Sequence, residues 1–264
     1  MASSEAARFP LIFGKEEATL EKAEKRLDYA IKAAKFVDNV VSKTSTLIWI
    51  LILCLASYAM YDTYAVYDKA NDKSILRYKP QTSENADAEE VPVIENSIAW
   101  LTIDDSPIDY PIMQGADNNE YLNKDPLGEF SLAGSIFMDY RNAKDFSDYY
   151  CLLYGHHMEH DSMFGALDHW KDKDYYDKHR TGTLIIGDTT YNLEIFAVLN
   201  CMSYDRQVFY PFEKSGLINY LENNAAIYDD PVSSGNILAM TTCAVTPSEA
   251  RLAVFAIISL PETT

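Results

Sequence analysis

The chain has 264 residues, of which 48% are hydrophobic and 12% aromatic, enough for one domain of ordinary size together with additional segments. Its formal net charge of −18 at pH 7 argues against a nucleic acid partner, because binding phosphates requires a basic surface. The four cysteines, Cys54, Cys151, Cys201 and Cys243, have neither the C-x-x-C spacing of a zinc site nor the density of a small disulfide-bonded domain.

The first 43 residues contain an amphipathic pattern. Apolar residues recur at steps of three and four from Leu20 to Val41, with charged residues between them, which predicts a helix over 15–43. Such a helix lies on the inner surface of a membrane, pairs with a partner, or is a solvated extension of the helix that follows.

The next segment, 44–61, has no charged residue over 18 positions and is rich in leucine and isoleucine. This length is near the lower limit for crossing a hydrocarbon core of about 30 Å. A cleavable signal peptide is disfavoured because the segment begins about forty residues into the chain and lacks a small-residue cleavage site. The sequence predicts one uncleaved transmembrane anchor. Five basic residues in the twenty before it and four in the twenty after it leave its orientation open.

Residues 62–93 are expected to join the anchor to the folded domain. Residues 64–78 have a short helical pattern, and 79–93 are polar, acidic and flanked by prolines, which indicates a linker or an exposed loop. The folded domain is predicted to occupy 94–264.

Eight segments of this domain have strand patterns: 98–103, 108–113, 135–138, 150–154, 183–186, 191–200, 237–242 and 252–258. Shorter helical patterns lie between them, at 118–123, 162–170, 174–179 and 214–226. Eight short strands interrupted by a few helices predict a mainly β fold, a closed eight-stranded β-barrel with peripheral helices.

Three residues at the ends of predicted strands indicate covalent chemistry. Cys243 follows the strand at 237–242, and Arg251 begins the next one. A thiol attacks only as its thiolate, so a cysteine with a pKa of about 8.5 needs a cation or a base nearby. Arg251 offers a permanent charge and donors for an oxyanion, and His156, after the strand at 150–154, offers an imidazole. This arrangement is expected of a covalent cysteine transpeptidase or protease.

Over residues 96–259 the chain resembles the sortases, and among them class B. The resemblance is carried by the segments NSIAWLTID, DYPIMQGADNNEYLN, GSIFMDYRN, LLYGHHM, DSMF and TTC, followed by Arg251. The resemblance implies that Cys243 is the nucleophile and that Arg251 holds the oxyanion and the substrate. It also implies that His156, rather than its neighbour His157, is the catalytic imidazole. The same resemblance implies a substrate groove lined by Asn118, Leu122, Tyr154 and Thr241, although each of these four fits a packing role equally well.

A sortase-like protein is expected to be a single-pass protein of the cell membrane with an extracellular catalytic domain, which would make residues 1–43 a cytoplasmic segment. It would cleave an LPxTG- or NPxTN-like sorting motif of a surface protein through a thioester and transfer it to an amine of a peptidoglycan precursor. The alternative acceptor is a lysine of a pilin. A catalytically silent, membrane-tethered binding barrel is disfavoured by the intact Cys243, His156 and Arg251. We expect no metal and no cofactor.

Overall fold

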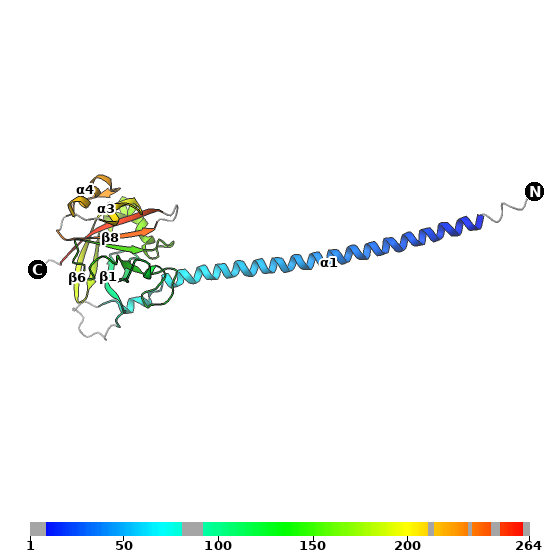
Figure 1. Ribbon diagram of the computed structural model, residues 1–264, viewed down its shortest axis with the longest axis horizontal. Helices are drawn as coiled ribbons and strands as arrows, with labels where there is room; N and C mark the ends of the chain where they lie inside the picture. Colours follow the sequence, from blue (N-terminus) through cyan, green and yellow to red (C-terminus); the bar gives the residue numbers. More distant parts are fainter. Residues whose placement is uncertain (1–8, 81–91, 211–213, 232–233, 244–248, 261–264) are drawn as a thin grey trace, which may run out of the picture. The chain divides into compact units, whose positions relative to one another are not determined.

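The computed structural model describes residues 9–80, 92–210, 214–231, 234–243 and 249–260. Contacts divide the chain into two units, Met1–Thr63 and Tyr64–Thr264. The first unit contains most of one helix, α1 (Phe9–Ala70). The second contains the end of α1, a 3-10 helix η1 (Lys73–Tyr78) and all of the strands (Figure 1). Most of the linker expected over 79–93, namely residues 81–91, lies outside the described residues.

Helix α1 runs without a break through the amphipathic segment and the apolar segment. Neither proline nor glycine occurs between residues 15 and 70, so nothing in this part of the sequence interrupts the helical hydrogen bonds. The hydroxyls of Thr46 and Thr63 donate to the carbonyls of Ser42 and Ala59, both at 2.9 Å, which satisfies these polar side chains within the helix. Among the described residues, this is the one helical stretch long and apolar enough to cross a membrane.

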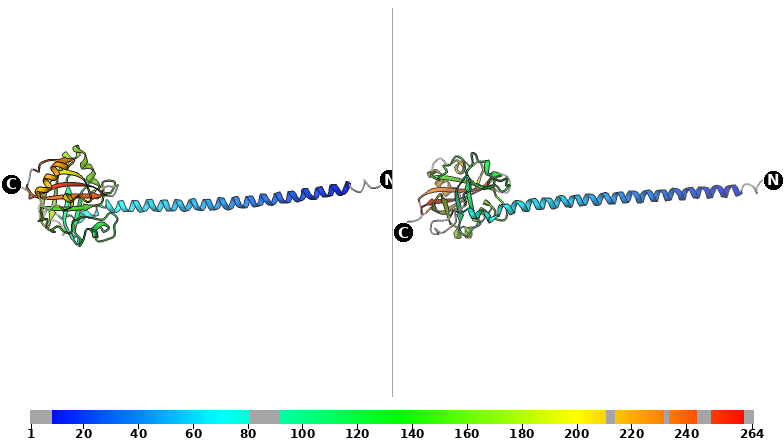
Figure 2. Two further views of the ribbon diagram at one scale, coloured as in Figure 1. Left: turned by 45° about the horizontal axis from the view of Figure 1, so that its top comes forward. Right: turned by 90° about the horizontal axis from the view of Figure 1, so that it is seen from below.

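The nine strands in the described part of the chain form one sheet in the order β5-β1-β2-β3-β4-β8-β9-β6-β7, and a further pairing of β5 with β6 closes eight of them into a barrel. This confirms the predicted fold class. The strands are β1 (Ser97–Ile103), β2 (Asp109–Met113), β3 (Ile136–Met138), β4 (Tyr150–Gly155), β5 (Thr181–Ile186), β6 (Thr189–Met202), β7 (Ile227–Tyr228), β8 (Asn236–Cys243) and β9 (Ala250–Ser259). Figure 2 shows the barrel from two further directions.

Short helices decorate the barrel: η2 (Glu120–Leu122), η3 (Phe164–Lys171), α2 (Lys173–Lys178), α3 (Arg206–Phe209) and α4 (Lys214–Asn224). Each of the four helical patterns within the barrel domain corresponds to one of them. The sequence did not predict α3 or β7, which have only four and two residues.

Strands β8 and β9 are buried on both faces, which explains their continuous apolar sequences. Leu238 and Val254 belong to the cluster inside the barrel. Ala239 and Phe255 belong to a second cluster outside it, which also contains Leu217 of α4. Side chains alternate between the two faces along a strand, so every second residue from Ala239 to the end of β8, and from Phe255 back to the start of β9, lies on the outer face. That edge is where the sequence predicted the reactive residues.

Candidate active site

The strand register brings the three predicted catalytic residues to one edge of the barrel. Parallel pairing of β4 with β8 sets Gly155 beside Thr242, and antiparallel pairing of β8 with β9 sets Cys243 opposite Arg251. His156 follows Gly155 directly, so its backbone lies one residue further along, at the level of Cys243. Neighbouring strands are about 4.8 Å apart, which places the three backbones on adjacent strands at one rim. The side chain of Cys243 lies outside the described part of the structure.

Gly155 is required where β4 ends. A Cβ atom at this position would lie 2.5 Å from Cδ1 of Ile136 and 2.7 Å from Cδ2 of Phe164, closer than real Cβ atoms approach other atoms. Glycine therefore lets the end of the strand pass against the buried side chains and deliver His156 to the rim.

The two adjacent histidines have different partners. His156 Nε2 lies 2.7 Å from the carbonyl oxygen of Leu122, and since a carbonyl only accepts, Nε2 carries the hydrogen. Nδ1 of His156 is then the ring nitrogen left to exchange a proton. His157 Nε2 lies 2.9 Å from Oδ2 of Asp168, and the His157 side chain is only 11% exposed. The two imidazoles are thus fixed by separate contacts.

A groove with a volume of about 420 Å³ begins at this rim. All four residues predicted to bind substrate line it, together with Arg251 and several aromatic side chains. The lining residues are Asn118, Leu122, Phe137, Tyr140, Arg141, Tyr154, Gly155, Ser203, Phe209, Tyr210, Thr241, Thr242 and Arg251. The Thr241 hydroxyl donates to the carbonyl of Leu153 at 2.7 Å, so it also fixes the strand beneath the groove.

A buried carboxylate, Asp139, joins several groove residues, and the sequence did not predict its role. Its Oδ2 accepts from Nδ2 of Asn118 at 3.0 Å and from the hydroxyl of Tyr154 at 2.9 Å. Arg141 donates to the two carboxylate oxygens from Nε at 2.8 Å and from Nη2 at 2.7 Å. Burial raises the pKa of Asp139, but the hydrogen bonds from Arg141, Asn118 and Tyr154 outweigh it and lower the pKa to about 2. The carboxylate is therefore ionised at neutral pH.

Tyr154 and Arg141 are held as donors by this carboxylate. Burial and the adjacent Asp139 charge raise the pKa of the Tyr154 phenol, so it keeps its proton. Its ring stacks on that of Phe209, with centroids 6.4 Å apart and planes 5° apart. The Arg141 guanidinium lies over the ring of Tyr210, 4.4 Å from its centroid. These contacts give the groove a fixed aromatic wall.

The other two cysteines of the barrel are unsuited to nucleophilic attack. Cys151 and Cys201 are free and buried, and burial raises the pKa of each thiol to about 12. Cys201 pairs with Arg251 across β6 and β9, so Arg251 lies between Cys201 on one side and Cys243 on the other. Among the described residues, no group of three histidine, cysteine or acidic side chains is placed to hold a metal ion.

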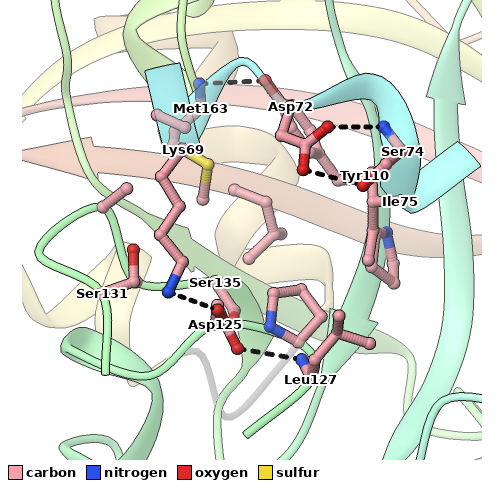
Figure 3. Close-up of a pocket in the computed structure, with 16 residues that line it drawn as sticks. Lys69, Asp72, Ser74, Ile75, Tyr110, Asp125, Leu127, Ser131, Ser135 and Met163 are labelled. Atoms are coloured by element: carbon pink, nitrogen blue, oxygen red, sulfur yellow. Dashed lines mark hydrogen bonds and ion pairs between the residues drawn. The ribbon is translucent and has the colours of Figure 1, made fainter. Parts of the chain in front are cut away.

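A second cavity of about 150 Å³ is lined by residues from the end of α1, from η1, from β2 and from the segment before β3 (Figure 3). Lys69 Nζ lies 2.8 Å from Oδ2 of Asp125 and donates to the carbonyl of Phe130 at 3.0 Å. The carboxylate of Asp72 accepts from Ser74. None of the predicted site residues lines this cavity, so it is separate from the candidate active site.

The chain is similar to known proteins of one family. The sortase domain model matches residues 101–258, more than half of the chain. Sortase B of Listeria monocytogenes is 38% identical over 156 residues, which are 56% of this chain and 63% of that protein. The chain thus spans less than two thirds of that relative. Sortase B of Staphylococcus aureus is 29% identical over 173 residues, 62% of this chain and 71% of that protein.

A solved structure supports the same assignment. It is a Streptococcus pyogenes class B sortase involved in pilus biogenesis, 33% identical to this chain, with a TM-score of 0.58. The match covers 62% of this chain and 92% of that structure. The closed barrel, the residues gathered at its rim and these matches lead to one conclusion: the chain belongs to the sortase family, and the relatives that it matches are class B sortases.

Proposed function

We propose that the protein is a membrane-anchored cysteine transpeptidase that cleaves a sorting motif near the C-terminus of a surface protein. The observation that carries the proposal is the strand register. It sets Cys243 of β8 opposite Arg251 of β9, and it sets Gly155 of β4 beside Thr242, so that His156 and Cys243 each come one residue later at the same level. The groove that starts at this rim supports a peptide substrate, because it is partly aromatic and lined by fixed polar groups.

In the first half of the reaction, the Cys243 thiolate attacks the carbonyl carbon of the motif threonine. Arg251 and backbone N–H groups stabilise the oxyanion. The bond from that carbon to the next residue's nitrogen then breaks, and His156 gives a proton to the departing amine. The threonine carbonyl remains bound to the sulfur as a thioester.

In the second half, an amine attacks the thioester carbon and gives a proton to His156. The carbon–sulfur bond breaks, a new amide forms and the thiolate is regenerated. Because Nε2 of His156 donates to the Leu122 carbonyl, Nδ1 is the nitrogen that moves the proton in both halves. No step requires a metal or a cofactor.

The apolar part of helix α1 supports membrane anchoring, and the similarity to sortases favours a barrel on the extracellular side. Residues 1–43 carry 8 basic and 7 acidic side chains, whereas the whole chain has a net charge of −18, so the acidic excess lies after the apolar segment. A strongly negative barrel stays soluble outside the cell and is repelled by anionic lipids.

The first candidate acceptor is an amine of a peptidoglycan precursor, and the second is a lysine of a pilin. The pilin lysine is kept as a candidate because the Streptococcus pyogenes relative is a class B sortase involved in pilus biogenesis. Both acceptors are tested by incubating the protein in detergent micelles with LPxTG and NPxTN peptides. Triglycine serves as a model of a peptidoglycan amine, and Nα-acetyl-lysine amide as a model of a pilin lysine.

We expect mass spectrometry to find an amide that joins the motif threonine to one of the two amines, and the preferred amine identifies the class of acceptor. Cys243→Ala is the control and forms no product. A folded wild-type protein that cleaves neither peptide, with either amine present, would argue against transpeptidation.

A further inference from the structure

Arg141 lies in the groove with part of its hydrogen-bonding capacity unused. Its Nε and Nη2 donate to Asp139, and Nη2 also donates to the carbonyl of Phe209 at 3.2 Å. Nη1 has no hydrogen-bond partner among the described residues, and the side chain is 38% exposed. A guanidinium has five N–H donors, and the two on Nη1 have no hydrogen-bond acceptor among the described protein atoms.

The environment of Arg141 selects an uncharged partner. Asp139 neutralises the guanidinium through two hydrogen bonds, so a second carboxylate at Nη1 would also meet the charge of Asp139. The rings of Tyr210 and Tyr140 lie 4.4 and 5.9 Å from the guanidinium carbon and further restrict its movement. A neutral amide oxygen fits such a pre-oriented donor.

The position of Arg141 along the groove sets which part of a peptide it meets. The backbone N–H of Asp139 donates to the carbonyl of Leu152 at 2.9 Å, so this part of the chain lies beside Leu152. Leu152 precedes His156 by four residues along β4, a distance of roughly 13 Å at about 3.3 Å per residue. An extended peptide that starts at the rim and follows β4 covers this distance in three or four residues.

We propose that Nη1 of Arg141 donates hydrogen bonds to an amide oxygen of the sorting peptide, three or four residues before the scissile carbonyl, and that Asp139 orients the guanidinium for this contact. This inference rests on the proposed function. The oxygen belongs either to the peptide backbone or to an amide side chain at the first position of the motif. Arg141 is then a substrate-binding residue, and Asp139 is a positioning residue.

The test measures peptide affinity by calorimetry with the full chain in detergent micelles, in a Cys243→Ala background that prevents turnover. We expect Arg141→Met to raise the Kd at least tenfold. Arg141→Lys keeps the charge but lacks the second nitrogen, so we expect it to fail to restore affinity. A backbone oxygen predicts the same loss with LPxTG and NPxTN peptides, whereas a side-chain amide predicts a loss with NPxTN alone.

Arg180→Met is the matched control. Arg180 is also held in ion pairs, with Glu194 and Asp229, and its guanidinium lies 5.3 Å from the centroid of the Tyr176 ring, but it does not line the groove. We expect this variant to bind like the parent. A Kd for Arg141→Met within twofold of the parent, or an equal loss in Arg180→Met, would overturn the inference.

The two proposals fail in different ways. Peptide binding that depends on Arg141, without a thioester on the wild-type protein, would refute transpeptidation and keep the Arg141 contact. Thioester formation with an affinity that is indifferent to Arg141 would do the reverse. Absence of binding by both peptides would count against both proposals. Urea unfolding midpoints of the two Arg141 variants show whether a loss of affinity reflects a loss of folded protein.

Discussion

His156 and His157 are adjacent in sequence, yet they make different contacts, and this difference predicts different effects of mutation. His156 is held by Leu122 at the rim, whereas His157 is held by Asp168. We expect His156→Ala to lower kcat/KM for peptide cleavage by about 10²–10⁴, the usual contribution of a general acid–base residue. His157→Ala is expected to lower it by less than about tenfold, since the ring of His157 contacts Asp168 and its loss is expected to disturb only the local fold. Equal losses in the two variants would contradict the assignment.

Asp139 predicts a pH dependence of stability. Its folded pKa of about 2 lies below the usual value of 3.8, so its contribution is complete above pH 3.8 and is lost as the pH falls towards 2. A shift of this size corresponds to about 2 kcal/mol. We expect the difference in free energy of unfolding between wild type and Asp139→Asn to shrink by that amount between pH 6 and pH 2. Parallel urea-unfolding results across this range would show that Asp139 is not held as described.

The residues at the rim were predictable, but the network below the groove was not. Cys243, Arg251 and His156 each occur at the end of a recognisable strand, and the family resemblance implied their roles. Asp139 joins Asn118 and Tyr154, which come from separate parts of the chain. Their spacing in sequence carries no signal of contact, because the contact depends on how β3, β4 and the segment before η2 fold together. The aspartate of the DYRN segment gave no local indication of burial.

At the scale of elements, η1 is predicted to stabilise the barrel. Ile75, Leu76 and Tyr78 pack against the cluster that contains Trp100, and Lys79 Nζ lies 2.9 Å from Oδ1 of Asp109. We expect a fragment that begins at residue 94 to unfold roughly 5–10 °C below one that begins at residue 64, since a few kcal/mol of packing is lost. Differential scanning calorimetry of the two fragments measures this directly. Equal melting temperatures would show that η1 contributes nothing to the stability of the barrel.

The strands of the barrel were predictable from their sequence patterns. All eight predicted strands occur, because alternating or continuous apolar runs are bounded by clear turn residues. The single helix α1 contains the pattern at 15–43, the apolar segment at 44–61 and the start of the pattern at 64–78. The sequence pattern changes from amphipathic to apolar along this stretch, whereas the backbone stays helical. Strand β7 and helix α3 are too short for any periodicity, and their positions depend on pairing with β6 and on capping by Asp205.

At the scale of the whole molecule, the apolar part of α1 is predicted to determine where the protein resides. Side chains such as Leu47, Trp49 and Leu53 are about two thirds exposed (66%, 68% and 67%) on the helix surface, which suits contact with lipid. Replacing Ile50 and Leu53 with arginine costs about 3 kcal/mol per residue at the centre of a membrane helix. We expect this variant to be released by an alkaline carbonate wash that leaves the wild type in the membrane pellet.

The matched control is the pair Leu20→Arg and Leu27→Arg in the amphipathic segment, which is expected to stay in the pellet. Release of both variants, or of neither, would contradict an anchor confined to the apolar segment. Neither pair of substitutions alters the acidic residues that follow the apolar segment in the sequence.

Thioester formation on Cys243 is tested by intact-protein mass spectrometry of the full chain after incubation with LPxTG and NPxTN peptides. We expect an adduct on Cys243 whose mass equals that of the peptide up to its threonine, less one water, and which disappears when an amine is added. Cys243→Ala is expected to form no adduct. An adduct on Cys151 or Cys201, or none on a folded protein that binds the peptide, would contradict the claim that this rim forms a thioester.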